Sequence, residues 1–234
     1  MSAQRFWIGG VAYTYEAEFD IDAAMWPPFY RGFDQPQPLP EGHELAWHVH
    51  LAGPGTSRPS GATELESESW RLWREGMLRT IAFEGAPHTP PQWTAEMNVQ
   101  AGRAEVRWDS RMESTRSGGA LFGNLLALNL DRFLTMYRLA EAGSGMLVHG
   151  AAADFGGQGW LFMGRSGRGK STLSNLLHRT KTALVLSDEK AVVRKLRNTF
   201  WLCGTPWPSR AGLAKAAVAR CGGWCFWNMA PKTR

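Results

Sequence analysis

One stretch of this chain, Gly164-Arg165-Ser166-Gly167-Arg168-Gly169-Lys170-Ser171-Thr172, matches the pattern G-x-x-x-x-G-K-[ST] at every fixed position. The residues before it, Trp160-Leu161-Phe162-Met163, are typical of a buried strand, and Ser174-Asn175-Leu176-Leu177-His178 after it continue a helix. A strand, a glycine-rich loop and a helix in this order are the context in which the pattern holds phosphates. The stretch therefore predicts a binding site for a nucleoside triphosphate.

Each residue type in this loop has a physical task. Glycines let successive backbone N–H groups point into one concavity, and the first turn of the following helix adds unpaired donors and the positive end of its dipole. Lys170 is predicted to reach the β- and γ-phosphates, and the Ser171 hydroxyl to bind Mg²⁺. Arg165 and Arg168 add positive charge at the rim. We predict that residues 164–172 all bind the nucleotide; the alternative is a glycine-rich turn without a ligand.

The composition indicates a globular protein. Of its 234 residues, 44% are hydrophobic, which is enough for a packed core. No apolar run reaches the roughly 18 residues of a membrane span, and Met1-Ser2-Ala3-Gln4-Arg5 begins no secretory signal, so we expect a cytoplasmic protein with no membrane partner. The 26 Lys and Arg residues outnumber 21 Asp and Glu. They are scattered, so no nucleic-acid partner is expected. Lys190, Arg194, Lys195 and Arg197 are predicted to form a solvated, phosphate-attracting rim.

Residues 1–115 are expected to form a small β-rich N-terminal unit. Hydrophobic and polar residues alternate at 6–18 and 45–51, and 92–109 predicts two strands around Ala101-Gly102-Arg103. Stretches rich in proline, glycine and serine between these segments predict loops. His48 and His50 share one strand face; they are either metal ligands or surface residues.

Residues 116–234 are expected to form a nucleotide-binding domain with an α/β fold. A helix is predicted from 120 to 142 and a strand from 146 to 155, ahead of the strand that feeds the phosphate loop. After the loop helix, Thr182-Ala183-Leu184-Val185-Leu186-Ser187 predicts another buried strand. This strand delivers Asp188 and Glu189 at its carboxyl end, where ligands bind in α/β sheets.

The acidic pair has the chemistry that phosphoryl transfer requires. Asp188 is predicted to hold the metal through water or to accept the proton of an attacking hydroxyl, and Glu189 to share either task. A solvated acid at a strand end is the alternative. His149, beside the phosphate-loop strand, is a further catalytic candidate, and the alternative for it is a histidine of the core.

Three segments together resemble the C-terminal catalytic domain of HPr kinase/phosphorylase and its relatives. They are Leu147-Val148-His149-Gly150-Ala151-Ala152-Ala153, the stretch from 159 to 171, and Leu186-Ser187-Asp188-Glu189. The resemblance covers roughly residues 146–212. It implies a P-loop core related to phosphoenolpyruvate carboxykinase, ATP and Mg²⁺ as cofactors, and assembly into oligomers. It also implies transfer of phosphate to a serine hydroxyl, with Lys170, Ser171, the acidic pair and His149 lining the site.

Two departures from the family pattern bear on the acceptor. Glu189 stands where the family usually has Asp, and Gly204-Thr205-Pro206-Trp207-Pro208 replaces the second signature segment. The segment resembles that of shorter, divergent relatives, some of which act on peptides or small molecules. We therefore expect a protein, peptide or small-molecule hydroxyl as acceptor, and neither the acceptor nor the choice of ATP over GTP is decided by the sequence.

The end of the chain follows a different pattern. Arg220-Cys221-Gly222-Gly223-Trp224-Cys225-Phe226-Trp227-Asn228-Met229-Ala230 shows neither a strand nor a helix period. Translated in the shifted frame, the same codons are restricted to a buried strand that ends in polar residues. We predict a frameshift near 216–220, so that 216–234 replaces the native end of the kinase core and leaves it incomplete. The alternative is a genuine tryptophan-rich tail.

The sequence thus predicts an ATP-dependent kinase. A nucleotide-binding regulatory protein without catalysis, or an inactive truncated paralogue, is the alternative. A transporter-type ATPase is disfavoured, because the chain has no LSGGQ-like segment and Asp188 follows Lys170 too closely.

Overall fold

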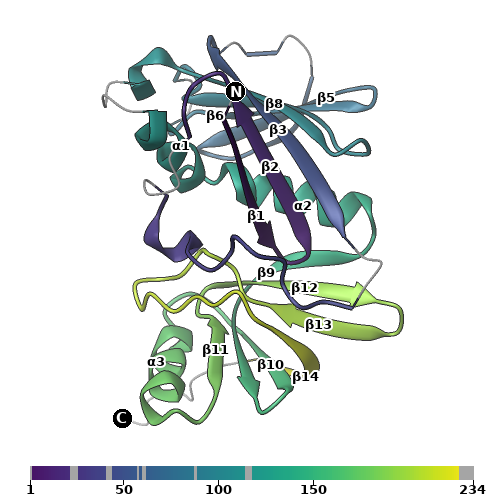
Figure 1. Ribbon diagram of the computed structural model, residues 1–234, viewed down its shortest axis with the longest axis vertical. Helices are drawn as coiled ribbons and strands as arrows, with labels where there is room; N and C mark the ends of the chain where they lie inside the picture. The colour runs from purple at the N-terminus through teal and green to yellow at the C-terminus, as the bar shows by residue number, and fades with distance from the viewer. Residues whose placement is uncertain are drawn as a thin grey trace. The chain divides into compact units, whose positions relative to one another are not determined.

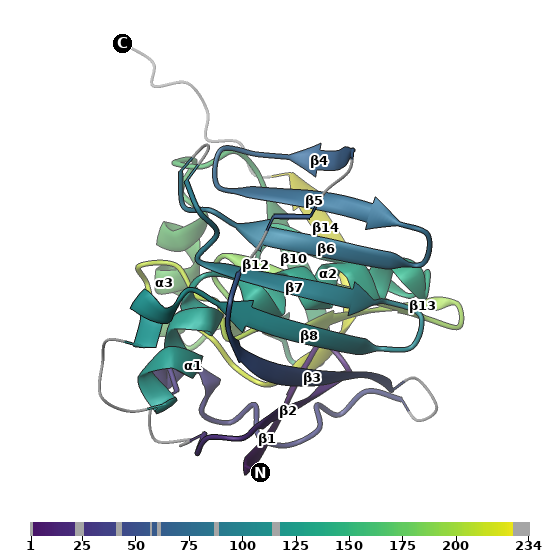
Figure 2. The same ribbon diagram turned by 90° about the horizontal axis from the view of Figure 1, so that it is seen from above.

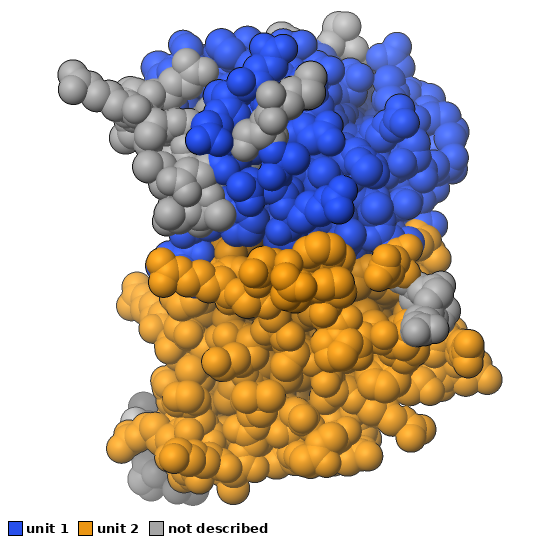
Figure 3. Space-filling model, in the orientation of Figure 1, with its two compact units in different colours: residues 1–6, 11–28, 45–141 blue, residues 7–10, 29–44, 142–234 orange. Residues whose placement is uncertain are grey.

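A computed structural model describes residues 2–21, 26–40, 44–56, 58–59, 62–86, 89–113 and 118–226 (Figure 1). The chain divides into two compact units (Figure 3). Unit 1 contains Met1–Phe6, Val11–Pro28 and Leu45–Glu141, and unit 2 contains Trp7–Gly10, Phe29–Glu44 and Ala142–Arg234. No helix among the described residues is long and apolar enough to cross a membrane.

Unit 1 is built on an eight-stranded sheet in the order β1-β2-β3-β8-β7-β6-β5-β4, whose strands lie side by side in Figure 2. The strands are β1 (Ser2–Ile8), β2 (Val11–Ala17), β3 (Leu45–Pro54), β4 (Thr63–Glu66), β5 (Trp70–Glu75), β6 (Leu78–Phe83), β7 (Trp93–Asn98) and β8 (Arg103–Trp108). β3 pairs in parallel with β2 and β8, and β4 to β8 pair antiparallel. The strands predicted at 45–51 and 92–109 are confirmed as β3, β7 and β8.

The helices α1 (Gly118–Ala127) and α2 (Leu130–Glu141) belong to unit 1, together with the short 3₁₀ helix η3 (Ser110–Glu113). The Trp47 indole N–H donates to the carbonyl oxygen of Leu134 at 2.9 Å, which fixes α2 to one face of the sheet. The sequence predicted one helix here. The break falls at Asn129, whose φ of 71° places it in the left-handed region, so the chain cannot continue as one α-helix.

Unit 2 contains six strands and one α-helix among its described residues. They are β9 (Gly145–Phe155), β10 (Gln158–Met163), α3 (Lys170–Thr180), β11 (Leu184–Ser187), β12 (Lys190–Leu196), β13 (Thr199–Cys203) and β14 (Val218–Phe226), with the 3₁₀ helix η2 at Pro28–Tyr30. The sheet order is β10-β14-β13-β12-β9-β11, and β10 also pairs with β9. The strands β9, β12, β13, β14 and β10 therefore form a closed ring of pairings. The predicted strands before and after the loop, and its helix, are confirmed as β10, β11 and α3.

The predicted α/β fold with a P-loop kinase core is wrong. The described residues form fourteen strands in two sheets and only three α-helices, so the fold is β-rich. The physical reason lies in the connections. Parallel strands need a long crossover, usually a helix. After β11 the chain instead runs on through two residues into β12 along the same strand, β9, because Ser187 pairs with Ala152 and Lys190 with His149. It then turns through Arg197 and Asn198 into β13, which pairs antiparallel with β12. In the sheet of unit 2, only β10 and β14 pair in parallel among the described strands.

The chain after residue 216 also differs from its prediction. Val218–Phe226 forms β14, between β10 and β13, so the expected absence of a strand here is wrong up to Phe226. Burial alternates along this strand, but Trp224 and Phe226 lie at its exposed positions, so the sequence shows no apolar alternation. Gly159 pairs with Cys221 and Trp160 with Gly223, so Gly222 is an extra residue at which the pairing with β10 shifts. Residues 227–234 lie outside the described part.

Segments from early in the sequence complete unit 2. The Trp7 amide donates to Phe33 at 2.7 Å, and the Gln37 side-chain amide donates to the Gly204 carbonyl at 3.0 Å. The Trp207 indole N–H donates to the Tyr30 hydroxyl at 3.0 Å. Residues 29–40 therefore pack against the segment that follows β13.

Candidate functional site

One cavity of about 530 Å³ in unit 2 gathers most of the predicted site residues. It is lined by His149, Ser166, Gly167, Gly169, Lys170, Ser171, Thr172, Asp188, Glu189, Ser209 and Arg210. Gly164, Arg165 and Arg168 do not line it. The cavity thus joins the phosphate-loop sequence to the histidine of β9, to the acidic pair after β11 and to a loop that the sequence did not single out.

The glycine-rich loop turns sharply into α3. Gly167 and Gly169 have φ values of 76° and 91°, in the left-handed region that glycine adopts without a steric penalty. Gly169 is the N-cap of α3 and provides no side-chain hydrogen bond to the first turn. The amides of that turn, with the positive end of the helix dipole, therefore face the cavity without a side-chain acceptor.

Lys170 is held at the base of this loop. Its side chain is almost fully buried, with 7% of the residue exposed, and its Nζ donates to the carbonyl oxygens of Gly164 at 2.6 Å and Arg165 at 3.1 Å. No carboxylate pairs with this ammonium group among the described residues. Gly164 and Arg165 thus act through their carbonyls, and the positive charge of Lys170 stays available to an anion.

Asp188 is the most enclosed acid of the cavity, with 1% exposed. Its Oδ1 accepts from the Ser209 amide at 2.8 Å, and its Oδ2 accepts from the Ser209 hydroxyl at 2.8 Å and from the Leu213 amide at 3.4 Å. The Ser209 Oγ also lies 3.3 Å from the Ser171 Oγ. Ser209 therefore connects the predicted metal-binding hydroxyl to the predicted catalytic carboxylate.

The loop 204–217 brings Ser209 and Arg210 to the site because both of its ends are paired with backbone. The Gly204 amide donates to Ala217 at 2.9 Å, and the Lys215 amide donates to Leu186 at 3.0 Å. Gly204 permits this approach: a Cβ there would lie 1.9 Å from the Lys215 carbonyl oxygen and 2.5 Å from that of Leu186. Only glycine fits such contacts.

Sequence reasoning missed Ser209 and Arg210. The signal that could have found them is the pattern that surrounds them. A strand ends in the glycine and prolines of 204–208, and another glycine, Gly212, follows shortly after. A hydroxyl and a cation between two such turns are candidates for a binding loop.

His149 and Glu189 lie at the more open side of the cavity. Partial burial, and then the positive charge of Lys170, lower the pKa of His149 from its ordinary value, which favours the neutral imidazole. The Lys190 Nζ donates to the Glu189 carboxylate at 2.9 Å, and the Glu189 carbonyl accepts from the Gly150 amide at 2.9 Å. His149 is exposed, so the alternative of a core histidine does not apply.

The predicted basic rim is only partly present. Arg194 is buried, with 1% exposed, and it donates to the carbonyl oxygens of Gly9 at 2.6 Å and Ser144 at 3.2 Å. Arg194 therefore connects Gly9 and Ser144 within unit 2. Lys195 and Arg197 are exposed, but neither lines the cavity.

The residues of the cavity fit a magnesium nucleotide. Ser171 and Asp188 offer a hydroxyl and a carboxylate, the hard oxygen ligands that Mg²⁺ takes in proteins. Lys170 and the uncapped first turn of α3 offer positive charge and donors to phosphate oxygens. Among the described residues, no three or more His, Cys, Asp or Glu side chains are grouped so that they could hold a metal ion. The fit therefore rests on the chemistry of these two oxygen donors and on the charge of Lys170.

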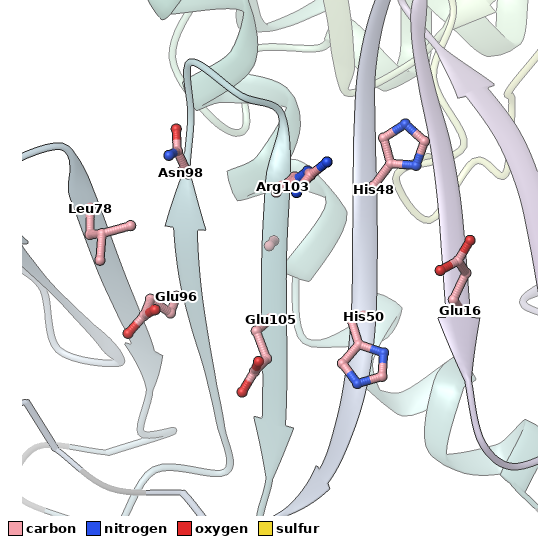
Figure 4. A pocket seen from close by; sticks show the side chains of 9 residues that line it. Glu16, His48, His50, Leu78, Glu96, Asn98, Arg103 and Glu105 are labelled. Carbon is pink, nitrogen blue, oxygen red and sulfur yellow. The ribbon is translucent and has the colours of Figure 1, made fainter.

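The histidines of unit 1 lie at a separate cavity of about 450 Å³ on the open face of the eight-stranded sheet. Figure 4 shows His48 and His50 on β3, with Glu16, Arg103 and Glu105 on the neighbouring strands. No group of three or more His, Cys, Asp or Glu residues placed to hold a metal is found among the described residues. His48 and His50 are both exposed, which favours the interpretation as surface residues.

A scan of the chain against protein-family models finds no match, and neither does a search of the curated proteins. The resemblance to HPr kinase/phosphorylase stays a prediction.

Proposed function

We propose that unit 2 binds a nucleoside triphosphate with Mg²⁺ and transfers its γ-phosphate to a hydroxyl group. The proposal rests on one observation: the same cavity is lined by Lys170, Ser171 and Asp188. A phosphate loop alone supports binding. A loop joined to a buried carboxylate at the end of β11, which pairs with β9 as the loop's strand β10 does, supports phosphoryl transfer.

Each group then has a task in the proposed reaction. Lys170 and the amides at the start of α3 bind the terminal phosphates and stabilise the charge that develops on them. Ser171 and Asp188 hold Mg²⁺, which supplies charge neutralisation at the phosphates when bound. Asp188 also accepts the proton of the attacking hydroxyl, and the neutral imidazole of His149 lies where it can assist as a second base.

Nucleotide binding without transfer is the second candidate, and one observation favours it. The two carboxylate oxygens of Asp188 already accept three hydrogen bonds, from Ser209 and Leu213. A carboxylate so engaged is less available to a hydroxyl from outside the chain. Unit 2 would then act as a nucleotide sensor.

Equilibrium dialysis with labelled ATP tests the binding step. Lys170→Ala is expected to weaken Mg-ATP binding by about 30- to 100-fold, because it removes a charged contact worth about 2–3 kcal/mol. Lys195→Ala removes an exposed lysine outside the cavity and serves as the matched control, with unchanged affinity. Equal affinities of the two variants would reject the assigned nucleotide site.

Transfer of label from γ-labelled ATP to a serine-peptide library distinguishes the two candidates. Transfer that is lost in Asp188→Asn supports the kinase. Tight binding by the wild-type chain, with neither transfer nor hydrolysis, supports the sensor.

A further inference from the structure

The site contains a hydroxyl group of its own at the position that an acceptor must occupy. The Ser209 Oγ lies 2.8 Å from the Asp188 carboxylate and 3.3 Å from the Ser171 Oγ. A hydroxyl in hydrogen-bond contact with a carboxylate base is the geometry of an activated nucleophile. Ser171 marks where the metal and the terminal phosphates bind.

The surroundings of Ser209 fix that hydroxyl in place. Its own amide donates to the other oxygen of Asp188 at 2.8 Å, so the backbone and the side chain of Ser209 are both directed at one carboxylate. The Gly212 amide closes a turn onto the Ser209 carbonyl at 3.1 Å. The residue is half-buried and lines the cavity, so a ligand can reach its oxygen.

We propose that Ser209 is the acceptor of a phosphate transferred within the same chain, an inference that rests on the proposed function. The Ser209 Oγ forms a bond to the γ-phosphorus of the bound nucleoside triphosphate. The bond from that phosphorus to the oxygen bridging to the β-phosphorus breaks, and its electron pair leaves with the nucleoside diphosphate. The hydroxyl proton passes to the Asp188 carboxylate. One chain therefore takes up one phosphate.

Phosphorylation would then change the site that performs it. A phosphoserine carries a charge of about −2, and beside an acid it disrupts by repulsion. At position 209 it lies against the Asp188 carboxylate, with which Ser209 now shares two hydrogen bonds. The charge also opposes the entry of a second triphosphate. The modification is therefore self-limiting: it lowers nucleotide affinity after one turnover.

Mass spectrometry of the full chain after phosphatase treatment and incubation with Mg-ATP tests the modification. We expect one phosphate per chain, mapped to the peptide that contains Ser209. It should be absent in Ser209→Ala and Lys170→Ala. It should be retained in Thr180→Ala, which removes an exposed hydroxyl at the end of α3. The Lys170→Ala chain should also stay unmodified when it is mixed with wild-type chain. Phosphate on its Ser209 in that mixture would show transfer between chains and overturn the intramolecular step.

A binding measurement tests the position of residue 209 without any turnover. Ser209→Glu is expected to weaken binding of a non-hydrolysable ATP analogue by about tenfold relative to Ser209→Gln, which has the same shape without the charge. Equal affinities of these two variants would overturn the placement of residue 209 beside the phosphates.

The outcomes separate this inference from the function on which it rests. Wild-type chain that binds and hydrolyses Mg-ATP, or phosphorylates a peptide, while Ser209 stays unmodified overturns the inference and leaves the proposed function intact. A chain that binds no nucleotide overturns both.

Discussion

At the scale of single residues, the three cysteines of this chain differ sharply in their surroundings. Cys203 is fully buried, and burial raises the pKa of its thiol to about 12. At pH 8 only about one in ten thousand of these thiols is ionised, and the thiolate is the form that reacts. Cys221 and Cys225 on β14 are partly exposed. Cys203 should therefore be the inert one.

Alkylation with iodoacetamide at pH 8 checks this difference by mass spectrometry. In the folded protein we expect Cys221 and Cys225 to be modified, and Cys203 to react at least about a hundredfold more slowly. Denaturation should make the three rates similar. Fast labelling of Cys203 in the folded chain would contradict its burial between β12 and β14.

The residues of the site were predictable where they share a local motif. Lys170 and Ser171 follow from the loop pattern, and Asp188 follows from the end of a buried strand. Ser209 could not be predicted in this way. It lies 21 residues after Asp188, and its role depends on hydrogen bonds that exist only when the loop folds back. The burial of Arg194 was missed for a similar reason, because its carbonyl partners on Gly9 and Ser144 lie far away in the sequence.

At the scale of elements, the loop 204–217 depends on its first glycine. Gly204→Ala is expected to destabilise the protein by about 3 kcal/mol or more, since the new methyl group meets the backbone oxygens of Lys215 and Leu186, the second of which accepts the Lys215 amide. It should also weaken nucleotide binding, because the displaced loop carries Ser209 and Arg210. Chemical denaturation and equilibrium dialysis measure the two effects.

Gly222→Ala is the matched control for this substitution. A Cβ at Gly222 meets the tip of the Gln158 side chain at 2.8 Å, and that side chain is exposed and can move. We expect a loss below about 1 kcal/mol and no change in nucleotide affinity. Equal losses for the two variants would show that the loop tolerates a side chain at Gly204.

The sequence predicted those elements whose apolar pattern is regular. Met146 to Phe155 and the segment ending at Ser187 have clear strand patterns and form β9 and β11. β12 was missed because Lys190, Arg194 and Lys195 obscure its alternation, although Arg194 lies in the interior. β14 was missed because Trp224 and Phe226 lie at its exposed positions, so its sequence shows no apolar alternation.

At the scale of the whole molecule, the expected fold class failed although most local elements were right. A strand, a loop and a helix are compatible with a parallel α/β sheet and with the antiparallel sheet of unit 2, and only the lengths of the connections distinguish them. The connections on both sides of β12 are two residues long, so neither can hold a crossover helix. The division into units also does not follow the order of the sequence. Residues 29–44 belong to unit 2, whereas α1 and α2, which come later in the chain, belong to unit 1.

If the nucleotide binds only to unit 2, its effect on stability should be confined to that unit. A ligand at a hundred times its Kd stabilises the folded state by about 2.7 kcal/mol. Mg-ATP should therefore slow amide hydrogen exchange at 164–172 and 204–213, while the strands of unit 1 keep their rates. In Lys170→Ala the protection should disappear at the same nucleotide concentration. Uniform protection of both units would mean that they unfold as one cooperative body, and protection of unit 1 alone would place the nucleotide elsewhere than the cavity around Lys170 and Asp188.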